Sequence, residues 1–222
     1  MTIYLIRHAD PDYAHDTLTA KGWREAELLS KRLRGISNAF YYVSPLGRAQ
    51  DTVSLALKAA HTNAVTLPWL HEFDTGYCVS SNFGASHIAW NLNPSVWITD
   101  SLCYDKDRWF LSDVYKNSGV HEVYRSVADG LDHLLALHSY AREGAAYKIL
   151  HTNTDNLLLF CHFGVECVLL SHLLGCSPVI LWNNSIALPS SVTILCTEEY
   201  SLDSAVFRMQ CFGDLSHLYA SP

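Results

Sequence analysis

Long apolar runs and an excess of positive charge are both missing from this sequence. No apolar run approaches the roughly 20 residues that a transmembrane helix needs, so we expect no membrane partner. Lysine and arginine total 15 against 22 aspartate and glutamate residues, and the resulting net charge of −7 argues against nucleic acid as a partner. The N-terminus has no basic segment ahead of its short apolar run, so we expect no signal peptide and a cytoplasmic protein.

Paired cysteine motifs are missing as well. The seven cysteines are an odd number in a chain of 222 residues, and no Cys-x-x-Cys occurs. Several lie inside apolar runs, as Cys161 and Cys196 do, which is typical of small core side chains in a reducing compartment. No spacing of cysteine and histidine supports a zinc site, so we expect no metal.

The remaining composition is that of a globular protein, with 49% hydrophobic and 17% charged residues. Apolar runs that predict strands alternate with amphipathic segments that predict helices. This alternation predicts an α/β protein with three α/β/α layers and a mostly parallel central sheet. The expected strands are residues 3–6, 40–43, 65–67, 157–161, 191–196 and 205–211, and the expected helices are 20–33, 47–60, 120–142 and 165–174.

Residues 77–147 interrupt the alternation. The stretch begins with loop-like sequence, is rich in tryptophan and aspartate, and contains the long helix pattern 120–142. We expect an insertion, helical and irregular, that caps the active-site face within a single domain spanning residues 1–222.

Polar side chains follow two of the predicted strands where each strand ends. Arg7 and His8 come directly after the first strand, and His162 follows strand 157–161. Ligand sites in open α/β sheets lie outside the carboxyl ends of the strands, so we expect these side chains at one edge of the sheet. The first stretch alone is equally compatible with a catalytic pair and with a polar cap on a strand.

Arg48 lies at the start of the helix 47–60. The helix dipole is already positive there and disfavours a cation. An anion bound between the arginine and the helix start would explain the placement. An exposed Arg48 that costs about a few tenths of a kcal/mol is the alternative. Arg7 and the two strand-end histidines favour the bound anion.

Four ordered motifs resemble those of the histidine phosphatase superfamily, which includes the cofactor-dependent phosphoglycerate mutases. The resemblance covers about residues 1–76 and 155–212. The LTAKG sequence at the start of the first helix also matches. The four motifs are IRHA at 6–9, SPLGRAQDT at 44–52, LHEF at 70–73 and FCHFGV at 160–165.

The resemblance implies roles for five side chains. His8 would attack phosphorus and form a phosphohistidine, for which its imidazole must be neutral and its other nitrogen held by a hydrogen bond. Arg7, Arg48 and His162 would bind the phosphoryl oxygens, with His162 also catalytic, so neither a metal nor another cofactor is implied. Glu72 would protonate the leaving oxygen and then activate water.

Three features depart from the family pattern. Ala9 replaces the usual glycine after the first histidine, and we expect it to be tolerated. Phe163 replaces the glycine after the second histidine and is expected to narrow the pocket or to pack beneath it. The loop after the first motif lacks the asparagine that often binds phosphate in the family. Asp74 remains a nearby alternative to Glu72 as the acid.

The leading functional prediction is a phosphatase that hydrolyses a small phosphorylated metabolite. A phosphoglycerate mutase is the first alternative, but its pocket needs extra cations, and residues 77–147 carry fewer basic than acidic residues. A non-catalytic protein that binds a phosphorylated ligand is the second alternative, although a binder needs no nucleophile and acid together. The sequence leaves the oligomeric state open, a homodimer included.

Overall fold

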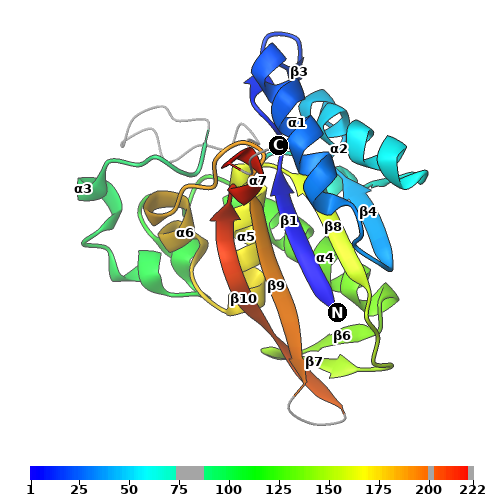
Figure 1. Cartoon of the computed structure of the whole chain (residues 1–222). Coiled ribbons are helices and arrows are strands. Elements are labelled where there is room, and N and C mark those ends of the chain that lie inside the picture. The colour runs from blue at the N-terminus through cyan, green and yellow to red at the C-terminus, as the bar shows by residue number, and fades with distance from the viewer. Residues whose placement is uncertain (74–87, 200–202, 220–222) are drawn as a thin grey trace.

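The computed structural model describes residues 1–73, 88–199 and 203–219. Asp74 and the beginning of the predicted insertion at Tyr77 lie outside these residues. One large sheet of eight strands runs through the described part of the chain (Figure 1). In order across the sheet, the strands are β5 (Val65–Thr66), β4 (Ala39–Val43), β8 (Asn156–Cys161), β1 (Thr2–Arg7), β9 (Val192–Glu199), β10 (Ser204–Asp214), β7 (Ala146–Ile149) and β6 (Tyr140–Glu143).

Parallel and antiparallel pairing divide this sheet into two halves. Strands β5, β4, β8 and β1 pair in parallel, whereas each pair from β1 to β6 across β9, β10 and β7 is antiparallel. Only β9 and β7 run against the direction of β1, so the sheet is mostly parallel in strand direction. The predicted α/β class with such a sheet is confirmed. Arg7 lies opposite Cys161, so β1 and β8 end level with each other.

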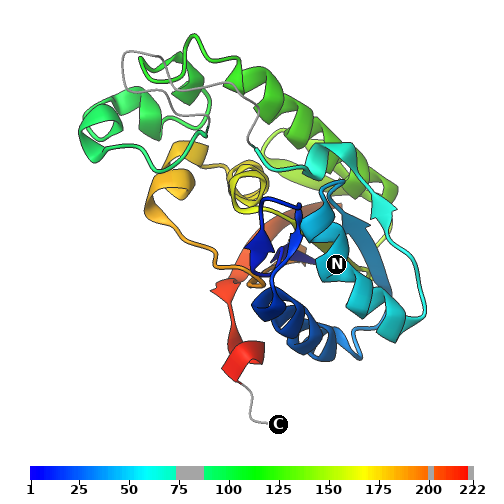
Figure 2. The ribbon, with the colours of Figure 1, turned by 90° about the horizontal axis from the view of Figure 1, so that it is seen from above.

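Helices cover both faces of the sheet (Figure 2). Helices α1 (Ala20–Leu33) and α2 (Gly47–Ala60) pack on one face, and α4 (Val120–Leu137) and α5 (Phe163–Leu174) lie on the other. The shorter elements are β2 (Pro11–Asp12), β3 (Thr17–Leu18), η1 (Pro68–Leu70), α3 (Pro94–Trp97), η3 (Ser101–Tyr104), η4 (Trp109–Leu111), α6 (Pro178–Asn184) and α7 (Ser216–Tyr219).

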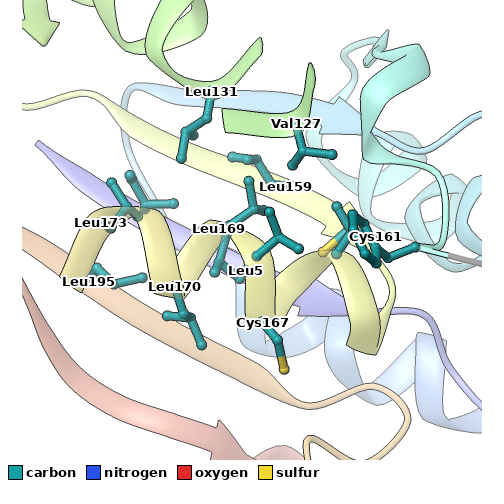
Figure 3. Packing of buried hydrophobic residues seen from close by; sticks show 14 of the residues in the cluster. Leu5, Val127, Leu131, Leu159, Cys161, Cys167, Leu169, Leu170, Leu173 and Leu195 are labelled. Atoms are coloured by element: carbon teal, nitrogen blue, oxygen red, sulfur yellow. The ribbon is translucent and has the colours of Figure 1, made fainter. Parts of the chain in front are cut away.

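The core is divided by the alternation of side chains along β8. Leu157, Leu159 and Cys161 point to the α4–α5 face, and Leu158 and Phe160 point to the α1–α2 face. Both faces are covered, so the strand is apolar throughout rather than alternating. Helix α5 packs on the sheet beside α4 and also contacts α6, so most of its surface is covered, which explains its largely apolar sequence (Figure 3).

Most predicted elements agree closely with the structure. The side chain of Thr19 caps α1 by accepting a hydrogen bond from the Gly22 N–H at 3.0 Å. Helix α2 has the predicted bounds, and α5 begins two residues earlier than predicted. The predicted strands 191–196 and 205–211 are present as β9 and β10, which pair in antiparallel orientation.

The predicted helix 120–142 is too long. Helix α4 ends at Leu137 because Ser139 adopts a left-handed backbone conformation with φ 74°. The chain then turns back at Gly144, which has φ 61°, and forms the hairpin β6–β7 at the edge of the sheet. The end of the predicted insertion 77–147 therefore belongs to the sheet rather than to a cap. That the earlier part caps the active-site face of a single domain stays a prediction.

Candidate active site

Two backbone hydrogen bonds bring three strand ends together. The His8 N–H donates to the Cys161 carbonyl at 3.0 Å, and the Ser44 N–H donates to the Phe160 carbonyl at 2.9 Å. These bonds continue the parallel pairing one residue beyond β1 and β4. As a result, the rings of His8 and His162 lie with their centroids 5.1 Å apart. The two histidines that the sequence places 154 positions apart are neighbours at one sheet edge.

The imidazole of His8 is held in one tautomer. Its Nδ1 lies 2.8 Å from the Ala9 carbonyl oxygen, which can only accept, so Nδ1 carries the proton and donates it. The lone pair of the neutral ring is then on Nε2. Burial lowers the pKa of His8 to about 3 against the effect of the Ala9 bond, and the charges of Arg7 and Arg48 lower it further. The imidazole of His8 is therefore neutral over the whole physiological pH range, as the predicted nucleophile has to be.

Arg7 is fixed at the end of β1. Its Nη1 donates to the Ala187 carbonyl at 2.6 Å, and its guanidinium lies 5.9 Å from the centroid of the Phe163 ring. These contacts hold the cation at the start of α5.

Arg48 is held by a carboxylate that sequence reasoning missed. Its Nη1 donates to Asp16 at 2.5 Å, and the other Asp16 oxygen accepts from the Gly47 N–H at 2.7 Å. Burial acts to raise the pKa of Asp16, but these hydrogen bonds and the Arg48 charge leave it below its usual range. The Tyr13 ring covers the guanidinium at 5.4 Å. Asp16 thus caps α2 and orients the arginine of its first turn.

His162 is fully buried against Ser44. Its Nε2 lies 2.7 Å from the Ser44 hydroxyl oxygen. Burial holds the pKa of His162 well below its usual value, with the His8 ring and both arginines acting in the same direction. Within the described residues, His162 Nδ1, Arg7 Nε and Arg48 Nε are buried atoms with no hydrogen-bond partner. Buried polar atoms are rarely left unpaired, so these nitrogens suit a bound anion.

Glu72 lies at the N-terminus of α5. Its Oε1 accepts from the Phe73 N–H at 2.8 Å and from the Gly164 N–H at 3.0 Å. Burial raises the pKa of the carboxyl, and the Phe73 bond and the charges of Arg7 and Arg48 only partly offset that rise. A carboxyl with a raised pKa beside two cations can give up a proton and take one back.

A cavity of about 550 Å³ lies at this site, and the buried side chains of His8 and His162 are not among the residues that line it. Arg7, Arg48 and Glu72 line it together with apolar and aromatic groups, and Phe163 is one of these. Further residues of the wall are Tyr13, Ile88, Trp90, Asn91, Ser185 and Ile186.

A larger hollow of about 690 Å³ lies between α4, the end of α5 and the β6–β7 hairpin. None of the predicted site residues lines it, whereas Arg7, Arg48 and Glu72 line the smaller cavity.

The backbone conformation of Ala9 explains why alanine can stand in place of the usual glycine. Ala9 is not among the residues with positive φ in the described part of the chain. Its N–H donates to the Thr52 hydroxyl at 2.9 Å, and this hydroxyl donates to the Arg48 carbonyl at 2.7 Å. Alanine is therefore free of strain, and its backbone N–H links the residue after His8 to α2.

A second buried carboxyl lies behind the site. Glu166 accepts a hydrogen bond from the Thr193 hydroxyl at 2.6 Å, and its Oε2 has no partner among the described residues. Burial raises its pKa to about 7 even though the Thr193 bond and Arg7 oppose the rise. A glutamate within the apolar run 163–170 was the available sequence signal, and sequence reasoning missed it.

Metal and membrane features are absent where the structure can be described. No group of three or more His, Cys, Asp and Glu side chains in residues 1–73, 88–199 and 203–219 is arranged to hold a metal ion. Over the same residues, no helix has both the length and the apolar sequence needed to cross a bilayer.

Comparison with known sequences identifies relatives of this chain. A model of the histidine phosphatase superfamily (branch 1) matches residues 3–208. A probable phosphoglycerate mutase, GpmB, of Proteus mirabilis (strain HI4320) is 27% identical over 85 residues. That match spans 34% of this chain and 40% of the Proteus protein, so it covers less than half of either.

Solved structures share the fold at low sequence identity. A putative alpha-ribazole-5'-P phosphatase of Escherichia coli has a TM-score of 0.64 and 18% identity over 97% of both chains. A phosphoserine phosphatase of Entamoeba histolytica, solved with phosphoserine, has a TM-score of 0.62 and 14% identity over 98% of both chains. At such low sequence identities, the structural similarity establishes only that this chain has the same fold.

Proposed function

This chain belongs to the histidine phosphatase superfamily, and on that premise we propose that it hydrolyses small phosphomonoesters through a phosphohistidine at His8. One observation carries the proposal. The only hydrogen bond at the His8 ring in the described residues leaves Nε2 with its lone pair, next to buried and unpartnered nitrogens of Arg7, Arg48 and His162. The proposed nucleophile and the proposed anion site thus lie at the same edge of the sheet, where the strands end.

Substrate binding depends on positive charge that is already in place. Arg7 and Arg48 are each fixed by a hydrogen bond to protein oxygen and would bind the phosphoryl oxygens through their remaining N–H groups. The N-termini of α2 and α5 add their dipoles at the same edge. These groups supply the charge neutralisation that phosphoryl transfer requires, so we propose a reaction without a metal.

The reaction then proceeds in two steps. The lone pair of His8 Nε2 forms a bond to phosphorus while the phosphorus–oxygen ester bond breaks, and Glu72 gives its proton to the leaving alkoxide. In the second step Glu72 takes a proton from water as the water oxygen attacks phosphorus. The phosphorus–nitrogen bond breaks, inorganic phosphate leaves, and Glu72 is again protonated.

The alternative is a phosphoglycerate mutase. The similarity to the Proteus protein, which spans 34% of the chain, favours this alternative. A mutase must hold a doubly phosphorylated intermediate, for which the two arginines of the cavity wall are a small number of cations. We therefore favour hydrolysis.

The proposal is tested with an aryl phosphate in the presence of a metal chelator. Wild-type protein is expected to release inorganic phosphate, and His8→Ala is expected to lose at least about 1,000-fold in kcat/KM while keeping the wild-type circular dichroism. Undiminished turnover by His8→Ala contradicts the nucleophile. With 3-phosphoglycerate as substrate, an isomerised product without inorganic phosphate would establish the mutase instead.

A further inference from the structure

Beyond the arginines and Glu72, the described wall of the cavity consists of apolar, aromatic and neutral polar side chains. Trp90 and Phe163 meet edge to face with their centroids 6.0 Å apart, and Ile88 and Ile186 lie on the same wall. Ile186 is 75% exposed, so its side chain borders the opening of the cavity rather than the core. Asn91 and Ser185 are neutral, and the charged side chains of the described wall are those of the proposed reaction.

Trp90 adjoins the proposed acid. A Cβ atom built on Gly164 would lie 2.3 Å from Trp90 Cζ3 and 2.7 Å from Glu72 Oε1. The indole edge and the carboxyl oxygen therefore contact the same point at the start of α5. In the proposed reaction the leaving oxygen lies at Glu72, so the carbon skeleton attached to that oxygen lies against Trp90.

A substrate whose leaving alcohol carries a negative charge would bind unfavourably in this cavity. Arg7 and Arg48 are the only lysines or arginines on the described wall, and both are occupied by the phosphoryl group in the proposed reaction. The sequence of residues 74–87 contains neither lysine nor arginine, so that stretch adds no fixed cation. A carboxylate on the leaving alcohol would thus have no arginine or lysine of its own and would lie near Glu72.

We propose that the physiological substrate is a phosphomonoester of an uncharged, apolar alcohol, aromatic or branched, whose hydrocarbon part packs on Trp90 and Phe163. Phosphorylated hydroxy acids and amino acids are excluded as good substrates. The inference rests on the proposed phosphatase function and assigns Trp90 as a residue that determines specificity.

Substrates with equally reactive ester bonds test how the protein recognises the leaving alcohol. Propyl, 3-phenylpropyl and 3-carboxypropyl phosphate release primary alcohols of similar acidity, so their intrinsic reactivity is nearly equal. We expect kcat/KM for the phenylpropyl ester to exceed that for the carboxypropyl ester by at least about tenfold, with the propyl ester between them. Trp90→Ala is expected to reduce the ratio of phenylpropyl to propyl turnover at least about fivefold. Equal kcat/KM values, or a preference for the carboxylate, overturn the inference.

A substitution at the opening of the cavity that should improve hydrolysis of a charged substrate provides a second test. Ile186→Arg adds a cation to the cavity wall at an exposed position and should raise kcat/KM for the carboxypropyl ester relative to the phenylpropyl ester at least about fivefold. Ile98→Arg is the control, because Ile98 is 51% exposed and does not line the cavity. An unchanged ratio in Ile186→Arg contradicts the assigned position of the leaving group. Hydrolysis of all three esters without discrimination refutes the substrate class alone, whereas hydrolysis of none refutes the phosphatase as well.

Discussion

In the proposed reaction Glu72 must be protonated to give its proton to the leaving oxygen. Burial raises its pKa above the ordinary value, so it holds its proton to a higher pH than an exposed glutamate. We expect kcat/KM for alkyl phosphates to fall as the pH rises through this raised pKa. Glu72→Gln should lose this limb of the pH profile and about 100-fold to 1,000-fold in kcat for alkyl esters.

A substrate with a good leaving group distinguishes the two proposed roles of Glu72, acid in the first step and base in the second. With p-nitrophenyl phosphate the leaving phenolate needs no proton, so Glu72→Gln should release one equivalent of p-nitrophenol rapidly. Slow turnover should follow, since the water that attacks the phosphohistidine has lost its base. Equal loss of the rapid phase with alkyl and aryl esters would exclude Glu72 as the acid.

Glu166 gives a prediction about stability. Its pKa is about 7 in the folded protein against 4.5 for an ordinary glutamate, so between these values the folded state keeps a proton that the unfolded state releases. The free energy of unfolding should therefore fall as the pH rises through this window, by up to about 1.4 kcal/mol per pH unit. Glu166→Gln keeps an acceptor for Thr193 and should not show this loss.

The measurement is urea unfolding at pH 5 and pH 8. Burial lowers the pKa of His8 and His162, so both destabilise the fold as the pH falls below about 6.5, in wild type and variant alike. The difference between wild type and Glu166→Gln isolates the glutamate. Glu122→Gln, on an exposed part of α4, is the control. The same pH dependence in all three proteins would refute the assignment.

At the scale of elements, the start of α5 brings the acid and the cavity wall together. Gly164→Ala places a methyl group against Trp90 and Glu72, so kcat/KM should fall at least about tenfold. Gly130→Ala in α4 is a matched control, because its methyl group meets Trp69 at 2.7 Å and not the site. It should destabilise the protein while changing kcat/KM less than about twofold. Similar kinetic losses in both variants would point to a general packing defect.

The elements that could be predicted are those whose signals are local. An apolar run followed by Arg7-His8 or by His162 marks a strand end without any knowledge of its neighbours, and Thr19 caps the helix that directly follows it. The β6–β7 hairpin was missed because a left-handed Ser139, which the sequence does not mark, separates it from α4. Helix α6, which begins at Pro178 behind the Ser177 cap, was not among the predicted helices.

Long-range contacts account for the rest of the site. Asp16 reaches Arg48 across 32 positions, and Gly164 contacts Glu72 across 92. Nothing next to Asp16 in the sequence distinguishes it from the other acidic residues of its polar loop. The place of Trp90 against Gly164 depends on how the predicted insertion packs, which no local sequence pattern indicates.

At the scale of the whole molecule, a cationic site lies within a protein of net charge −7. An anion that binds only the folded state stabilises it, by about 2.7 kcal/mol at 100 times its Kd. Inorganic phosphate at that concentration should raise Tm by about 5–10 °C relative to sodium chloride of equal ionic strength. The shift should fall by more than half in Arg48→Gln. Equal shifts in both proteins would place the bound phosphate elsewhere.

The covalent intermediate is the central claim, and trapping it is the most direct test. Protein mixed with a ³²P-labelled phosphomonoester and quenched in base within milliseconds should carry label that is stable to base and lost in mild acid, as for a phosphohistidine. Mass spectrometry should place the phosphate on the peptide containing His8, and His8→Ala should carry none. Steady release of phosphate without label on wild-type protein, or label on a residue other than His8, would contradict the account.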